Sequence, residues 1–157
     1  MNTKQVIQSQ YLAALAMLKE VIVKCPEALW NAPGNQEPCW KKSYHALFYV
    51  HLYLQNAEKD FVRWEKHHDP DNGVPFTKDE VLEYLSFVEQ QVAERVPVID
   101  LDADSGFHWY PVNKLELQFI SIRHIQQHAG ELSERLGTLE NIELGWEGFS
   151  HTYSDLS

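Results

Sequence analysis

The sequence predicts an all-α fold, a four-helix bundle in a single domain that spans residues 1–157. Four stretches carry apolar residues at helical spacing, and no internal repeat or linker divides the chain. Hydrophobic residues make up 44% of the sequence, which argues against a disordered chain. A chain of 157 residues is long enough to bury a core without disulfide or metal staples.

The first two predicted helices cover residues 3–24 and 38–57. Apolar residues of the first approximate a helical stripe, and it ends at Cys25 because the residue before Pro26 avoids the helical region. The second, PCWKKSYHALFYVHLYLQNA, is rich in aromatic residues and resembles a strand in composition. Its length of about 20 residues without Gly or internal Pro favours a helix.

The other two predicted helices cover residues 77–96 and 113–137. The third begins with a capping box, in which Thr77 and Glu80 each satisfy a free backbone amide. The fourth opens with a weaker form of the same signal, and Gly137 provides a C-terminal stop.

Two predicted connections, residues 58–76 and 98–112, exceed the usual two to eight residues between bundle helices. Long ordered connections are often functional, although a segment that crosses the length of a bundle is equally consistent. The connection 58–76 is long enough to make the second and third helices parallel.

Charge and composition exclude several classes of protein. A net charge of −10 argues against nucleic-acid binding and against attachment to an anionic membrane. The first residues, MNTKQVIQSQ, lack the apolar core of a signal peptide, and no run approaches 18 apolar residues, so we expect a cytoplasmic protein. Cys25 and Cys39 form no disulfide framework or metal-spaced pair. We expect reduced, partly buried thiols, with a disulfide between them as the alternative.

The stretch IRHIQQHAGEL raises the question of a metal site. His124 and His128 lie four residues apart, so on a helix both rings point the same way and can bind one cation. Such a pair alone is a weak signal in a chain with eight histidines, and two core histidines are the alternative. A zincin motif is unsupported, because Ile125 occupies the position of its glutamate.

A metal site in a bundle needs further ligands from a facing helix, and the second predicted helix offers His45 and His51. These two are six residues apart and point about 120° away from each other, so only one can face the site. If the second and fourth helices are antiparallel, His45 and His128 lie at similar depths. The mixed face around His45 leaves the choice open.

Glu131 follows His128 by three residues and shares its face. It is a candidate fourth ligand, a general base, a second-shell residue or a surface carboxylate. Of the remaining histidines, His67 and His68 are expected at the surface, and His108 is expected to be packed or to line a site. His151 receives no role.

The stretches WKKSYHALFYVHLYL and SGFHWYPVNKLELQFISIRHIQQHAGEL resemble the DinB-like (YfiT-related) family of four-helix-bundle proteins with metal sites. The resemblance extends from about Trp40 to Leu136. It implies a bundle of mixed topology, with a long crossover between helices two and three, and it implies homodimers.

Carried over residue by residue, the resemblance implies that His45, His124 and His128 are the metal ligands. Glu131 departs from the glutamine usual at its position, which leaves its role open.

Three neutral imidazoles suit zinc, nickel, copper or iron, of which we expect zinc or nickel, and they leave a coordination position open for water or substrate. The resemblance implies transfer of a low-molecular-weight thiol to an electrophile, with small-molecule partners and no nucleic acid or membrane. The alternatives are a metal-dependent hydrolase and a non-catalytic, dimeric, stress-associated metal-binding bundle. Haem or di-metal carboxylate chemistry is disfavoured, because the sequence lacks the paired Glu-x-x-His motifs that such bundles use.

Trp146 and Phe149 are expected to pack on the bundle or on a partner subunit.

Overall fold

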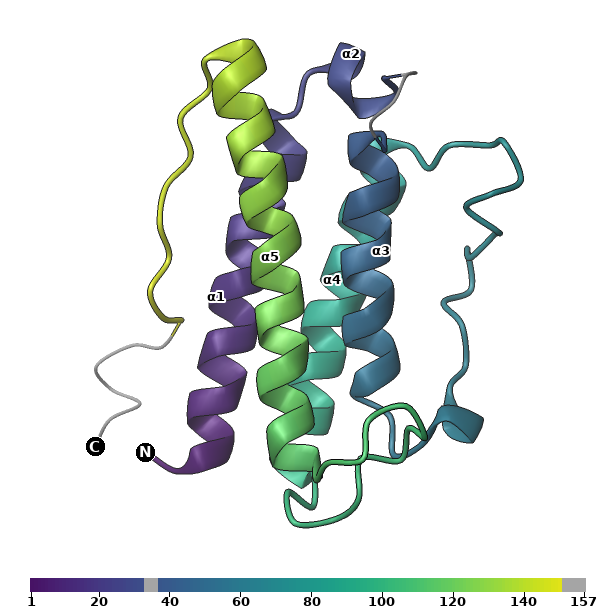
Figure 1. The fold of residues 1–157 in the computed structure, drawn as a ribbon, viewed down its shortest axis with the longest axis vertical. Coiled ribbons are helices and arrows are strands. Elements are labelled where there is room, and N and C mark those ends of the chain that lie inside the picture. The colour runs from purple at the N-terminus through teal and green to yellow at the C-terminus, as the bar shows by residue number, and fades with distance from the viewer. Residues whose placement is uncertain (33–36, 151–157) are drawn as a thin grey trace.

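The computed structural model describes residues 1–32 and 37–150, and Figure 1 shows that this part of the chain is helical. The prediction of an all-α protein is confirmed. An isolated β-bridge between Asp104 and Asn113 is the sole extended pairing in these residues. The elements are α1 (Thr3–Lys24), α2 (Glu27–Trp30), α3 (Cys39–Tyr53), η1 (Glu58–Asp60), α4 (Lys78–Arg95), η2 (Val96–Val98) and α5 (Lys114–Glu140).

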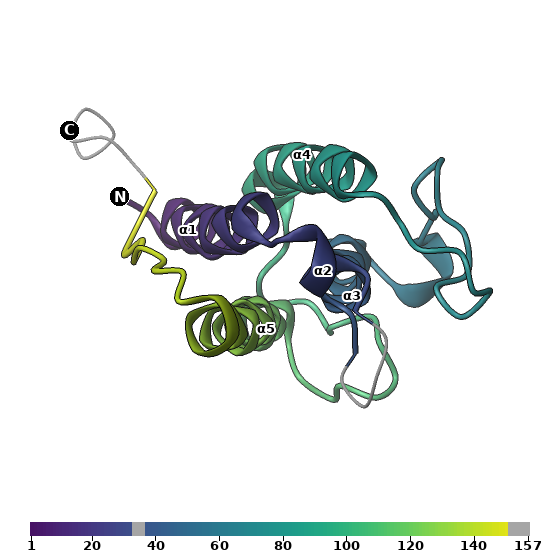
Figure 2. The same ribbon diagram turned by 90° about the horizontal axis from the view of Figure 1, so that it is seen from above.

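Four long helices lie side by side around a common core. Helix α1 packs against α4 and α5, and α3 packs against the same two helices from the other side (Figure 2). In Figure 1, α3 and α4 run in one direction while α1 and α5 run in the other. The chain between α3 and α4 therefore returns along the whole length of the helices. This arrangement makes α3 antiparallel to α5, the helix that carries the histidine pair.

A second, smaller core forms where α3 ends. Leu52, Tyr53, Phe107 and Leu117 pack together there, beneath the connection between η2 and α5. Lys114 is only 7% exposed, and its ammonium donates to the carbonyl oxygens of Asn56 at 2.7 Å and Ser105 at 3.0 Å. These bonds join the connection to the end of α3.

These bonds also explain why α3 stops at Tyr53 rather than at residue 57 as predicted. Lys114 takes the carbonyl oxygen of Asn56, and the backbone amide of Glu58 donates to the carbonyl oxygen of Gly106 at 3.2 Å. The backbone after Tyr53 thus forms hydrogen bonds with Lys114 and Gly106, outside the helix. The composition of residues 38–57 alone does not predict these bonds.

The stop predicted at Gly137 is also wrong, because α5 continues to Glu140. Asn141 adopts the left-handed conformation (φ 54°) that ends the helix, and asparagine tolerates this better than most residues. A glycine inside a helix costs about 1 kcal/mol relative to alanine, which the packing of α5 outweighs.

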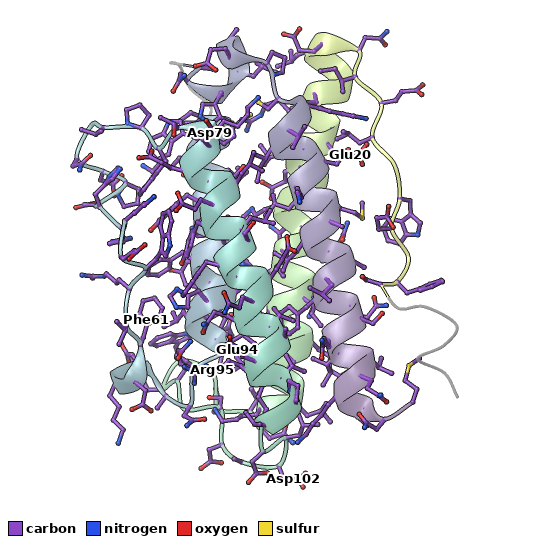
Figure 3. The ribbon with its side chains drawn as sticks, turned by 180° about the vertical axis from the view of Figure 1, so that it is seen from behind. Glu20, Phe61, Asp79, Glu94, Arg95 and Asp102 are labelled. Atoms are coloured by element: carbon purple, nitrogen blue, oxygen red, sulfur yellow. The ribbon has the colours of Figure 1, made fainter. Side chains whose placement is uncertain are left out.

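Beyond α5 the chain runs back along α1. The amide of Gly145 donates to the Glu20 carboxylate at 3.1 Å, and the Gln10 side chain donates to the carbonyl oxygen of Gly148 at 3.0 Å. Figure 3 shows Glu20 on the side of α1 that faces this segment. Trp146 is 74% exposed, so the prediction that it packs on the bundle is wrong. Packing against a partner subunit stays a prediction.

Among the described residues, α1 is long and apolar enough to cross a membrane by length and composition. Polar residues such as Gln10 and Lys19 interrupt its apolar residues, so the expectation that no run approaches 18 apolar residues is not contradicted. Half of its most apolar 18-residue window is buried against the rest of the protein.

The two cysteines are free and buried, as expected. They lie where the end of α1 meets the start of α3. A hydrogen bond from Cys25, together with the nearby charge of Arg135, lowers the pKa of Cys39 despite burial.

Candidate metal centre

His45, on α3, meets His124 and His128, on α5, across the interface of the two antiparallel helices. The Nε2 atom of His124 lies 3.3 Å from Nε2 of His45 and 3.0 Å from Nε2 of His128. One ligand atom from each of the three residues falls within 4.8 Å of the others. Side chains separated by about 80 residues in the chain thus converge on one point.

Two of the three separations between these nitrogens match those of ligands around one ion. Two imidazole nitrogens about 2.0–2.1 Å from a tetrahedral zinc ion lie roughly 3.3 Å apart. The observed separations of 3.0 and 3.3 Å are close to this value. Among the described residues, these three histidines are the group that could hold a metal ion.

The environment of His124 and His45 favours the neutral form of the imidazole, which is the form that binds metals. Burial, followed by the charges of His128 and His45, lowers the pKa of His124 to about 4. Burial also lowers the pKa of His45, with a further contribution from His128. Neutral ring nitrogens that point at one another cannot all be satisfied by a proton, whereas a cation satisfies all three lone pairs at once.

The ring of Tyr49 packs against two of these histidines. Its centroid lies 4.8 Å from that of His45 and 5.5 Å from that of His124. Tyr49 follows His45 by four residues on α3, so this contact could have been predicted from helical spacing once His45 was chosen.

Glu131 lies behind His128, on the side away from the convergent nitrogens. Its carboxylate is 3.5 Å from Nδ1 of His128, forms an ion pair with Lys42 and accepts a hydrogen bond from Gln127 at 3.2 Å. The hydrogen bond from Lys42 is the main reason why the pKa of Glu131 falls to about 2. Glu131 is therefore an anion at neutral pH.

This placement bears on the role of Glu131. Its carboxylate is not among the ligand atoms that converge, which weighs against Glu131 as a fourth metal ligand. Although Glu131 is near, the buried Nδ1 of His128 makes no hydrogen bond. A small rotation would let Nδ1–H donate to the carboxylate, the interaction that orients metal-bound histidines and makes them more basic. No pattern in the sequence indicates a role for Lys42. Lys42 lies on α3 and is connected to the site only through its ion pair with Glu131 on α5.

His51 faces away from the three-histidine group. Its Nδ1 lies 2.9 Å from the hydroxyl of Tyr84 on α4, and its ring packs on Phe61 and Phe87. This position agrees with the prediction that only one of His45 and His51 can face the site.

Burial of His51 should make the protein less stable in mild acid. Burial, reinforced by the charge of Arg95, lowers its pKa from 6.5 to about 4, so the unfolded chain binds this proton more tightly than the folded protein does. Stability from this group is therefore full above pH 6.5 and is lost as the pH falls toward 4. Between pH 7.5 and 5, wild type should lose about 2 kcal/mol more of its unfolding free energy than His51→Gln. Urea denaturation at both pH values measures the difference, and parallel losses would contradict it.

For the remaining histidines, the structure differs in part from the positions that the sequence predicted. His67 and His68 are half-buried rather than at the surface, because His67 hydrogen-bonds the hydroxyl of Tyr44 and His68 stacks on Phe76 at 3.8 Å. The side chain of His108 is 80% exposed, 3.4 Å from the Glu58 carboxylate. His151 lies outside the described residues.

No family model matches the chain, and no curated protein or solved structure matches it either. Its relationship to the DinB-like family stays a prediction, and the geometry of the three histidines is the feature that points to a function.

Proposed function

We propose that this protein is a metal-dependent enzyme of the DinB-like, four-helix-bundle kind, in which His45, His124 and His128 bind one divalent ion. The observation that supports this most is the convergence of three Nε2 atoms from two helices. An all-nitrogen set of this kind suits zinc or nickel.

The proposed reaction is transfer of a low-molecular-weight thiol to an electrophile. A divalent ion at a three-histidine site would favour the thiolate, which is the nucleophilic form of a thiol. The protein would supply the rest: after a small rotation of the His128 ring, Glu131, held by Lys42, would orient it, and the half-buried position of the histidines limits access of water.

A screen of thiols against electrophiles tests the reaction. The zinc- and nickel-loaded full chain is incubated with thiols and an alkylating electrophile such as monochlorobimane, and the product is measured by fluorescence. We expect turnover by wild type and background rates from chelated protein and from His124→Ala. Turnover that survives in His124→Ala would overturn the proposal.

A specific outcome identifies each alternative. Ester hydrolysis without thiol transfer would indicate a metal-dependent hydrolase. Stoichiometric metal without turnover of any thiol or ester would indicate a non-catalytic metal-binding bundle. The exposed Trp146 favours an interaction role of that kind, since a large exposed aromatic ring is suited to contact a second subunit.

Removing the carboxylate behind His128 should weaken metal binding without abolishing it. Glu131→Ala deletes the anion that lies 3.5 Å from Nδ1 of His128, so the ring loses its orienting partner. We expect zinc affinity to fall about 10- to 100-fold, as is usual for such partners, measured by competition with a chromophoric chelator. Glu134→Ala, an equal loss of charge on an exposed position of α5, should leave the affinity unchanged. A greater loss from Glu134→Ala than from Glu131→Ala would contradict the assignment.

A further inference from the structure

A cavity of about 620 Å³ lies between α3 and the connection 58–76, and His45 forms part of its wall. Figure 2 shows this connection on the outer side of α3, away from the other long helices. The volume is typical of a site for a small molecule. Because His45 belongs both to this wall and to the convergent histidines, a molecule in the cavity would lie next to the proposed metal position.

Aromatic rings on α3 form one wall of the cavity. Tyr44, Phe48 and Tyr49 all line it, with ring centroids 6.4 Å apart for Tyr44 and Phe48 and 5.6 Å apart for Phe48 and Tyr49. Such a wall favours a ligand with an apolar or planar body, which gains by contact with the rings.

The two basic side chains that line the cavity, Lys41 and Arg63, differ in whether an acidic side chain pairs with them. Lys41 is neutralised by an ion pair with Asp71, and the acidic Asp69 and Glu37 share that part of the lining. Arg63 also lines the cavity, and it has no ion pair or hydrogen bond within residues 1–32 and 37–150.

Arg63 lines the cavity together with Tyr44 and His67, whose side chains are joined by a hydrogen bond. Arg63 is exposed to solvent, so a ligand that enters the cavity can reach it.

We infer that this cavity binds a small organic acid, with its carboxylate on Arg63 and its apolar or aromatic body on the α3 rings. A guanidinium matches a carboxylate with two parallel hydrogen bonds. A phosphate dianion fits less well, because a single unpaired cation would face it while acidic side chains share the lining. The inference rests on the proposed function in one respect: the bound acid would be a substrate of the three-histidine site.

Titrations of the metal-free full chain followed by NMR test this inference without using catalysis. The probes are 3-phenylpropionate, its neutral amide and phenyl phosphate, each of which carries a phenyl ring. We expect the carboxylate to bind most tightly and to shift resonances of Phe48, Tyr49 and His67. Arg63→Gln should weaken its binding roughly tenfold or more, the usual effect of losing a charged hydrogen bond. Lys59→Gln, the same change of charge in η1 and outside the cavity lining, should bind as wild type does.

The contrary results are distinct from failure of the proposed function. Equal binding of the amide, tighter binding of the phosphate, or unchanged binding by Arg63→Gln would overturn the inference. So would carboxylate binding that appears only after zinc is added, since the carboxylate would then recognise the metal. Absence of zinc binding with carboxylate binding intact would overturn the proposed function and leave the cavity as a separate acid-binding site.

Discussion

His124→Ala should lose stoichiometric zinc binding, with affinity at least about 100-fold below that of wild type. His124 is the central member of the group, because its Nε2 is within 3.3 Å of both other ring nitrogens. Its removal leaves two imidazoles on different helices, which cannot enclose an ion. Metal analysis of the purified protein, followed by titration against a competing chelator, measures the loss.

His108→Ala serves as the matched control, since it removes an exposed histidine that lies outside the group. This variant should bind one zinc ion per chain as wild type does. Negligible and equal zinc and nickel in wild type and His124→Ala would eliminate the metal site. Equal losses in both variants would show that binding depends on the number of histidines and not on their convergence.

Gly106→Ala should be the most destabilising single change in the loop region. Gly106 has φ +86°, and an added Cβ would lie 2.1 Å from the carbonyl oxygen of Asn56. The left-handed backbone costs alanine about 1–2 kcal/mol, and the clash with backbone must be relieved as well. We expect an unfolding free energy lower by about 3 kcal/mol and a Tm lower by roughly 6–12 °C, measured on metal-free protein.

Gly73→Ala separates the two causes. Gly73 has φ +83°, nearly the same backbone conformation, but an added Cβ would meet nothing within 4 Å. Its cost should be about 1–2 kcal/mol, from conformation alone. An equal loss of stability in both variants would show that close contact between the loop and the end of α3 contributes nothing.

The helices could be predicted where their signals are local. The capping box of Thr77 and Glu80 is present, and α1 has the bounds predicted for it. Predictions failed where distant groups decide. α3 ends early because Lys114 binds carbonyl oxygens far away in the chain, and α5 continues past Gly137 because packing outweighs the cost of glycine.

Two of the three ligands of the candidate metal centre follow from spacing alone. His124 and His128 are four residues apart, so any helix at this position brings their rings together. Spacing does not choose between His45 and His51, because it specifies only that they point in different directions. The choice depends on which face of α3 lies against α5.

The sequence by itself determined that this chain is helical and that one pair of histidines shares a helix face, because periodicity and capping act over a few residues. Residue spacing left His45 and His51 open, the family resemblance implied His45, and the structure places His45 beside the pair. Only the tertiary structure decided that Glu131 lies behind His128 and that Arg63 lines a cavity without an ion pair among the described residues. These are contacts between segments far apart in the chain, and their geometry depends on how whole helices pack.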